Sequence, residues 1–305
     1  MASEVPSGLE IFQPEFIQTR MAIKMAKGLR ITPFLNRDTV PSRSMYTFFS
    51  EDATAEEDIS SGAMAKPYRV APGANLTPIR MSDLNADSQP VEVRGFELIV
   101  ENQKLEEQGQ SVLRFMERMA YRIGREVETD SNTRLAADAA ASTASLVDGN
   151  WDDSTGINKD IIRMQEAFQD DSLPDELTGI FYEGVNHREL KEFLDDIGNS
   201  ADVIYNNQND ITYKGTRHIY GGRNMVHGTT LGFDLANPPS TIAYGVVEGA
   251  SSPQVLEGME GFAPILNVKI SPMEDELYPK TKIQMAAETT VVTELPAALQ
   301  KQTGL

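Results

Sequence analysis

The sequence predicts an α+β fold, and three observations lead to that prediction. Residues Gln89–Val100 are rich in β-branched and apolar side chains, which is typical of a strand. A long amphipathic helix, Asn102–Glu128, follows that strand without a linker. Near the end of the chain, Lys282–Val292 alternates apolar and polar residues with the period of a second strand. No phosphate-binding glycine loop separates the first strand from the helix, so a nucleotide-binding fold is not supported.

The long helix has two contrasting faces at 100° per residue, and Asn102 is suited to cap its N-terminus. With 1.5 Å per residue it would extend about 40 Å and act as a spine for other elements. One face is apolar and consists of Leu105, Val112, Met116, Met119, Ala120, Ile123 and Val127. The opposite face has a stripe of arginines: Arg114, Arg118, Arg122 and Arg125.

The arginine stripe has two interpretations. Guanidinium groups spaced along a helix are suited to neutralising the phosphates of a nucleic acid. Alternatively, they form ion pairs with Glu117, Glu126 and other carboxylates of this acidic chain. The ion-pair interpretation is the simpler one and is preferred.

Charge is distributed unevenly along the 305 residues, whose net charge is −19. Residues 1–50 carry six basic and four acidic side chains, whereas residues 51–305 carry 21 and 42. A body this acidic argues against a general nucleic-acid-binding protein. It favours a protein from a high-salt cytoplasm over an ordinary acidic one, because salt screens the self-repulsion of the surface.

Composition excludes several other classes. The chain has no cysteine, so disulfides, thiolate catalysis and cysteine-bound zinc are absent. No apolar run approaches the length that spans a bilayer, and the N-terminus does not have the pattern of a signal peptide, so no membrane partner is expected.

The first hundred residues predict an arm followed by a ribbon. Prolines punctuate residues 1–44, and Glu15–Lys27 is suited to a short helix without a clean apolar stripe. We expect this arm to dock on a neighbouring acidic surface. Residues 45–101 predict a two-stranded ribbon around an acidic, proline-broken excursion, which has too little core to be stable alone.

Helix is expected to continue over Thr133–Ser145, and an acidic loop follows. Asp148, Asn150 and Asp152 have the spacing of a calcium-binding loop. However, Asp153 replaces its turn glycine and Lys159 its bidentate glutamate, so an acidic turn is preferred.

Residues 151–262 predict a mixed unit of helices and strands. Asn158–Phe168 is expected to be helical, Leu177–Tyr182 a strand, and a second helix to begin at Asn186 with Glu189 as a capping-box partner. A strand over Ile265–Ile270 precedes the closing strand.

Residues for catalysis are scarce. The three histidines, His187, His218 and His227, have no metal-binding spacing, and His187 is interpreted as a surface or capping residue. Nucleophile-elbow and Walker motifs are absent. We therefore expect no enzyme activity, no catalytic residues, no resident metal and no cofactor.

The order of these elements resembles the major capsid proteins of tailed double-stranded DNA viruses, which have the Hong Kong 97-type fold. The resemblance rests on VEVRGFELIVENQKLEEQGQSVLRFMERMAYRIGREVE at the spine and VVTELPAALQKQTGL at the C-terminus. It implies the segments known as N-arm, E-loop, P-domain and A-domain. These correspond to an N-arm at 1–44, an E-loop with its leading strand at 45–101, the P-domain spine at 102–150, an A-domain at 151–262, and P-domain strands at 263–305.

The resemblance also implies partners and contact residues. Subunits of such proteins form hexamers and pentamers of an icosahedral shell around non-specifically bound double-stranded DNA, assembled in the host cytoplasm with a portal and minor or decoration proteins. The acidic composition adds a haloarchaeal host as a hypothesis. The arginine stripe then becomes a candidate interior face toward DNA. Inter-subunit contacts are expected at Arg20, Lys24, Lys27 and Arg30 in the arm and at Glu51, Asp52, Lys66 and Arg69 in the E-loop.

Two other functions stay open. An encapsulin-type compartment shell has the same fold and encloses an enzyme instead of DNA. A halophilic enzyme with a site assembled from scattered residues is the third alternative, against which the lack of any catalytic motif argues.

Overall fold

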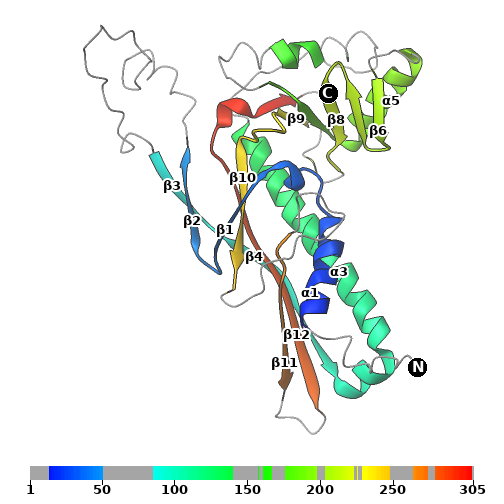
Figure 1. Cartoon of the computed structure of the whole chain (residues 1–305), viewed down its shortest axis with the longest axis vertical. Coiled ribbons are helices and arrows are strands. Elements are labelled where there is room, and N and C mark those ends of the chain that lie inside the picture. Colours follow the sequence, from blue (N-terminus) through cyan, green and yellow to red (C-terminus); the bar gives the residue numbers. More distant parts are fainter. Residues whose placement is uncertain are drawn as a thin grey trace, which may run out of the picture. The chain divides into compact units, whose positions relative to one another are not determined.

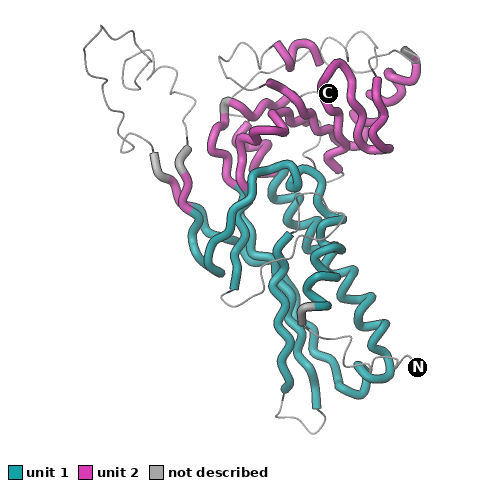
Figure 2. The backbone as a smooth tube through the Cα atoms, viewed as in Figure 1, with its two compact units in different colours: residues 1–46, 89–132, 242–291 teal, residues 47–88, 133–241, 292–305 magenta. Residues whose placement is uncertain are grey.

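A computed structural model shows two compact units formed by discontinuous segments (Figure 2). Unit 1 comprises residues 1–46, 89–132 and 242–291, and unit 2 comprises residues 47–88, 133–241 and 292–305. The structure describes residues 14–50, 85–139, 157, 161–166, 176–197, 203–222, 225, 229–247, 264–273 and 279–303. These two units differ from the five predicted segments, whose boundaries stay a prediction.

The sheet of unit 1 is organised around its long strand β12 (Lys280–Thr293). On it pair β4 (Glu92–Glu101), β10 (Ser240–Val246) and β11 (Asn267–Met273), and β1 (Asn36–Pro41) pairs with β10. β4 and β11 are both antiparallel to β12, so the predicted first strand and closing strand are neighbours (Figure 1).

The predicted alternation of β12 is confirmed. The expected inward positions are all buried: Ile283, Met285, Ala287, Thr289 and Val291. From Ala287 onward both faces of the strand are covered, so the pattern of a half-exposed strand changes to that of a fully buried one.

The spine helix α3 (Asn102–Asp138) is confirmed and continues into the predicted alanine-rich segment as far as Asp138, whereas residues 140–145 of that segment lie outside the described residues. Its backbone departs from helical geometry at Gln108, which has φ −130° and ψ 24°. Leu113 is fully buried, whereas the predicted positions Val112 and Met119 are only half-buried. Leu105, Met116, Ala120, Ile123 and Val127 are buried as predicted.

Helix α1 (Pro14–Ala26) confirms the short helix expected within Glu15–Lys27 and lies along α3 (Figure 1). The expectation that this helix has no apolar stripe is wrong, because Ile17, Met21 and Met25 recur every four residues and are fully buried. The approach is close because two glycines meet backbone: a Cβ on Gly124 would lie 2.2 Å from the Met25 carbonyl oxygen, and one on Gly28 would lie 2.8 Å from that of Tyr121. A short helix, η2 (Thr32–Phe34), then leads into β1.

The two strands at the base of the predicted ribbon, β2 (Met45–Ser50) and β3 (Asn85–Pro90), pair as a separate two-stranded sheet. The excursion between them lies outside the described residues.

Unit 2 contains a six-stranded sheet in the order β13-β9-β5-β8-β7-β6. Its strands are β5 (Gly179–Tyr182), β6 (Val203–Asn207), β7 (Asp210–Tyr213), β8 (Thr216–Tyr220), β9 (Thr229–Phe233) and β13 (Gln300–Thr303). β5 and β8 are parallel, and the other recorded pairs are antiparallel. The short helix η4 (Pro296–Ala298) precedes β13.

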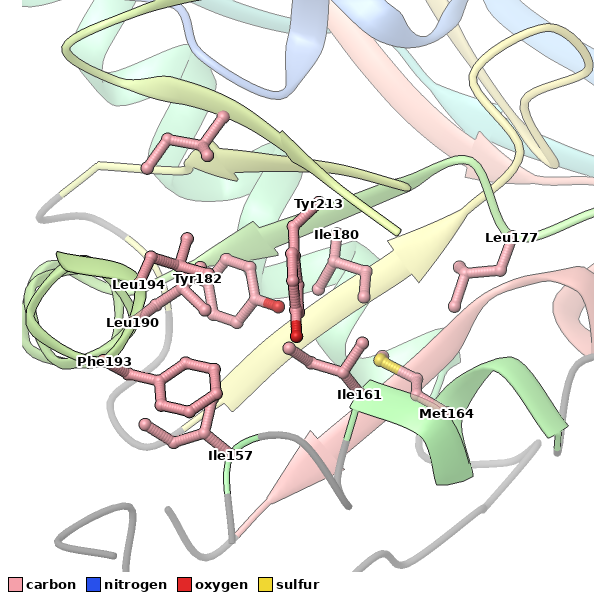
Figure 3. Packing of buried hydrophobic residues seen from close by; sticks show 11 residues of the cluster. Ile157, Ile161, Met164, Leu177, Ile180, Tyr182, Leu190, Phe193, Leu194 and Tyr213 are labelled. Atoms are coloured by element: carbon pink, nitrogen blue, oxygen red, sulfur yellow. The ribbon is translucent and has the colours of Figure 1, made fainter. Parts of the chain in front are cut away.

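Helix α5 (Gly184–Ile197) packs on this sheet, with Leu190, Phe193 and Leu194 buried as predicted (Figure 3). Ile161 and Met164, from the helical residues 161–166, join the same apolar cluster. The helix begins two residues before the predicted cap, so Asn186 lies in its first turn. Asn186 is buried and its side-chain nitrogen has no hydrogen-bond partner among the described residues.

Within the described residues, no helix combines the length and apolar content needed to cross a membrane.

Candidate functional surfaces

The four basic residues expected in the arm divide into two pairs. Arg20 and Lys24 project from α1 to the same carboxylate, Glu117 of α3, at 2.6 Å and 3.2 Å. Burial alone would raise the pKa of Glu117, but hydrogen bonds from both cations outweigh it and lower the pKa. Lys27 and Arg30 are exposed. A contact of these four residues with another subunit stays a prediction.

A buried carboxylate fastens the segment after α1 to the spine helix. Glu128 is 1% exposed, and its oxygens accept hydrogen bonds from the backbone N–H of Ile31 at 2.7 Å and the hydroxyl of Thr32 at 2.6 Å. The backbone N–H groups of Arg30 and Thr32 point to the same carboxylate. Glu128 therefore accepts hydrogen bonds from backbone N–H groups before and at the start of η2, where a helix leaves its first N–H groups without a partner.

A second buried carboxylate, Glu288 of β12, holds the turn between β1 and the ribbon strand β2. It accepts from the Ser42 hydroxyl at 2.9 Å and from the Arg43 backbone N–H at 2.8 Å. Arg43 has a φ of 56°, a left-handed conformation that is strained for a residue with a side chain. The turn at Ser42 and Arg43 is thus held to β12 by a carboxylate that stabilises an unfavourable backbone angle.

The structure keeps the arginine stripe together on the solvent face of α3. Arg114, Arg118, Arg122 and Arg125 are all exposed. Two large aromatic residues are partly exposed between them, Phe115 at 45% and Tyr121 at 42%, although Phe115 also contacts Phe96 edge-on.

The structure bears on one of the two acids named in the ion-pair interpretation of the stripe. Glu117 is bound by Arg20 and Lys24 of α1. Glu126 is exposed one helical turn after Arg122, and the ion-pair interpretation stays a prediction.

Two groups of predicted residues lie outside the described residues: Glu51, Asp52, Lys66 and Arg69 of the excursion, and the weak calcium candidates Asp148, Asn150 and Asp152. Where the structure does describe the chain, no group of three or more histidine and acidic residues could hold a metal ion.

The histidines of unit 2 differ from the prediction for His187, which is 5% exposed rather than on the surface. His218 is fully buried, and its Nδ1 is 2.7 Å from the hydroxyl of Tyr182. Burial lowers the pKa of each histidine to about 4, and the positive charge of Lys191 adds to the effect on His187. Both histidines are therefore neutral at pH 7 and act as interior packing groups.

Sequence reasoning missed Glu128, Gly124 and the docking of α1, although one signal was present. Glu117, Gly124 and Glu128 recur at intervals of seven and four residues, which places them on one side of α3. Two acids and a glycine aligned on one side of a long helix favour the docking of a second helix there. The acids can pair with its basic side chains, and the glycine allows close approach of its backbone.

Comparisons with known proteins show which folds this arrangement of helices and strands resembles. No family model matches the chain, and no curated protein matches its sequence. Solved structures do match. The virus-like particle from Pyrococcus furiosus has a TM-score of 0.53 at 11% identity, with 94% of this chain and 98% of that chain covered.

Two further matches come from a virus and from a compartment. The capsid of the cyanophage P-SCSP1u has a TM-score of 0.52 at 10% identity, covering 88% of this chain and 86% of that one. The holo-SrpI encapsulin complex from Synechococcus elongatus PCC 7942 has a TM-score of 0.51 at 10% identity, covering 100% and 92%.

These likenesses extend over most of both chains, and the architecture is mixed helix and sheet. The chain has an α+β fold of the kind found in capsid and encapsulin shells. Specifically, it has the Hong Kong 97-type capsid fold, as the sequence predicted.

Proposed function

We propose that this chain is a structural shell protein, the major capsid protein of a tailed double-stranded DNA virus. The observation that supports this best is the extent of the structural likeness, which covers 94% of this chain and 98% of a chain from a virus-like particle. If the whole subunit is built to form a shell, its likeness to another shell protein should extend over the whole chain. A shell-type domain attached to an enzyme would match over only part of the chain.

In this proposal, identical subunits form hexamers and pentamers of a closed shell. The ribbon fits that role because a two-stranded sheet has too little core of its own, and another subunit would provide the missing surface. The exposed Lys27 and Arg30, together with the excursion residues Glu51, Asp52, Lys66 and Arg69, are our candidates for contacts between subunits. A portal and minor or decoration proteins would complete the particle in the host cytoplasm.

The acidic composition supports a haloarchaeal host. A net charge of −19 on one subunit is multiplied over a shell, so like-charge repulsion between subunits is large unless salt screens it. We expect shells to be stable at molar salt and to loosen in dilute buffer.

An encapsulin-type compartment is the second candidate. It is favoured by the likeness to the holo-SrpI encapsulin complex, which covers 100% of this chain at a TM-score of 0.51. The two candidates share the shell and differ in its content. An enzyme with a scattered site is less well supported, because all three compared structures are named as particles, capsids or encapsulins.

The content of the purified assembly distinguishes the two candidates. The chain is purified from its native source at molar salt by size-exclusion chromatography with light scattering, and the particles are treated with nuclease and then opened. Nuclease-protected DNA with portal protein supports the virus. A single stoichiometric enzyme without DNA supports the compartment, and a monomer with neither contradicts both.

A further inference from the structure

Helix α5 begins at the carboxyl ends of two parallel strands. β5 and β8 are neighbours in the sheet of unit 2, and their last residues, Tyr182 and Tyr220, lie opposite each other in the parallel register. The chain leaves β5 at Tyr182 and enters α5 at Gly184. The N-terminus of α5 is therefore beside the carboxyl ends of both strands, which is where sheets with parallel strands commonly bind ligands.

The N-terminus of α5 presents backbone donors. The first hydrogen bond of the helix runs from the His187 backbone N–H to the Glu183 carbonyl oxygen at 2.9 Å. The N–H groups of Gly184, Val185 and Asn186 precede it and have no acceptor within the helix. Over the 14 residues of α5 the peptide dipoles add up to a partial positive charge at this end, which favours a negatively charged group.

Two buried side chains in the same turn add polar atoms without partners, and they are the observation that points to a ligand. Asn186 is 3% and His187 is 5% exposed. Among the described residues, neither Nδ2 of Asn186 nor Nε2 of His187 has a hydrogen-bond partner. Helix side chains lean toward the N-terminus, so both groups lie toward the free N–H groups of the first turn. Buried polar atoms rarely stay unpaired in folded proteins, so these two are suited to holding a ligand.

Tyr220 adds a hydroxyl beside this turn. Its ring centroid is 5.6 Å from that of His187, and a Cβ on Gly184 would lie 3.7 Å from its hydroxyl oxygen. Gly184 and Tyr220 are half-buried and Val185 is exposed, so a small ligand can reach the turn from solvent. Burial and the positive charge of Lys191 lower the pKa of His187 to about 4. The imidazole is therefore neutral at pH 7 and can carry its proton on Nε2.

We propose that the first turn of α5, together with the Tyr220 hydroxyl, is a binding site for a small oxyanion, either phosphate or a carboxylate group. Its backbone N–H groups, the Asn186 amide nitrogen, the His187 Nε2 and the Tyr220 hydroxyl can all donate hydrogen bonds. The ligand must therefore supply acceptors, which phosphate and carboxylate oxygens do. This site goes beyond the proposed function and does not depend on it, because all of its residues belong to unit 2 of one subunit.

Equilibrium dialysis of the full chain against radiolabelled phosphate and, separately, radiolabelled acetate tests the site. The measurements are made at a low and a high chloride concentration, so that competition by chloride is seen directly. N186V/H187F removes both side-chain donors and keeps an aromatic ring beside Tyr220. Q302L is the matched control: Gln302 is 2% exposed and its Nε2 is also unpartnered, but it lies on β13, which β9 separates from β5. Circular dichroism verifies the fold of each variant.

We expect wild type and Q302L to bind one oxyanion per chain and N186V/H187F to bind it at least tenfold more weakly. Tighter binding of phosphate than of acetate would identify phosphate as the ligand group, and the reverse order would identify a carboxylate. The proposal is overturned if wild type shows no saturable binding of either ion at either chloride concentration, or if N186V/H187F binds as Q302L does.

A second variant keeps the test decisive if N186V/H187F does not fold. N186D preserves the size of the Asn186 side chain and places a negative charge among the donors, so it should abolish binding of both ions. Unchanged binding by N186D would also overturn the proposal. Dialysis reports on single subunits and on assemblies alike, so a chain that binds the oxyanion but forms no shell would contradict the proposed function and leave this site established.

Discussion

Units 1 and 2 each bury an ionisable side chain, and they accommodate it in opposite ways. In unit 1, Glu128 is surrounded by backbone N–H groups and a hydroxyl that donate to its oxygens. In unit 2, His218 lies between aromatic rings, stacked on Tyr182 at 5.6 Å and tilted against Tyr213 at 6.1 Å. The first site is built from donors that need an acceptor. In the second, tyrosine rings keep the imidazole from water, and the Tyr182 hydroxyl lies 2.7 Å from its Nδ1.

The comparison shows that burial alone does not determine how stability responds to pH. Burial raises the pKa of Glu128 above its ordinary 4.5, although the donors around it act in the other direction. Burial lowers the pKa of His187 and His218 to about 4. Glu128 therefore contributes stability that is fully present below pH 4.5 and declines as the pH rises through its folded-state pKa. The histidines contribute stability that is present above pH 6.5 and is lost as the pH falls toward 4.

The largest effect we predict is a selective loosening of unit 2 by acid. Between about pH 6.5 and 4 the unfolded chain binds protons on the two histidines that the folded unit does not bind. The loss is on the order of 2 kcal/mol for each buried histidine. Hydrogen exchange measured at pH 7.5 and 4.5, corrected for intrinsic rates, should show faster opening of β5, β7 and β8, while the residues around Glu128 keep their protection.

Glutamine at both positions gives the control for this prediction. H187Q/H218Q retains polar side chains of similar size that do not titrate, so its unit 2 should open at rates that depend much less on pH. Parallel pH profiles for wild type and the double variant would show that the histidines are not the cause.

The second largest effect tests the carboxylate of unit 1. E128A leaves the N–H groups of Ile31 and Thr32 and the Thr32 hydroxyl without an acceptor in the interior, so we expect a loss of about 2–4 kcal/mol in the free energy of unfolding. Urea unfolding measures the loss, and hydrogen exchange at residues 30–35 locates it. E126A is the matched control, because Glu126 is exposed on the same helix and should change stability by less than about 0.5 kcal/mol. Equal effects of the two variants would mean that Glu128 is not the acceptor that holds this segment.

A somewhat smaller effect is predicted for the helix contact beside Glu128. G124A places a methyl group 2.2 Å from the Met25 carbonyl oxygen, so α1 must move away from α3, and we expect a loss of about 1–3 kcal/mol. G184A is its control, since a Cβ there meets nothing closer than 3.6 Å. Thermal unfolding of both variants measures the difference. If G124A is as stable as G184A, the close approach of the two helices does not contribute as described.

The smallest effect concerns Glu288, the second carboxylate that accepts backbone donors in unit 1. R43G should raise stability by up to about 1 kcal/mol, because glycine adopts the φ of 56° without strain and the hydrogen bond to Glu288 is kept. R37G, in the extended strand β1, is the comparison and should lower stability. A destabilised R43G would indicate that the Arg43 side chain has a role that outweighs its backbone strain.

Periodicity predicted the elements whose packing is regular. The inward positions of β12, the length of α3 and the buried residues of α5 all follow from spacing, because one face of each meets a single apolar surface. On α3 the prediction selected Val112, which is half-buried, where Leu113 is fully buried. A helical wheel places both side chains near the edge of the apolar face and cannot say which of them a neighbouring element covers.

The candidate contact surfaces were harder to predict, because they depend on tertiary neighbours. β1 has a polar, mostly exposed sequence and joins the sheet through its backbone, so no side-chain pattern marks it. The stripe arginines were found by spacing alone, but only the structure shows that Glu117, one of their expected partners, is bound by Arg20 and Lys24 of α1. His187 was interpreted as a surface or capping residue and no position was predicted for Glu128, and only the fold shows that both are buried.

Electron microscopy of the purified full chain at molar salt tests the central claim, that this protein builds a shell, most directly. The account predicts closed particles composed of hexamers and pentamers, which open into smaller oligomers after dialysis into dilute buffer. A chain that stays a monomer at high concentration and molar salt, with its fold intact by circular dichroism, would contradict it.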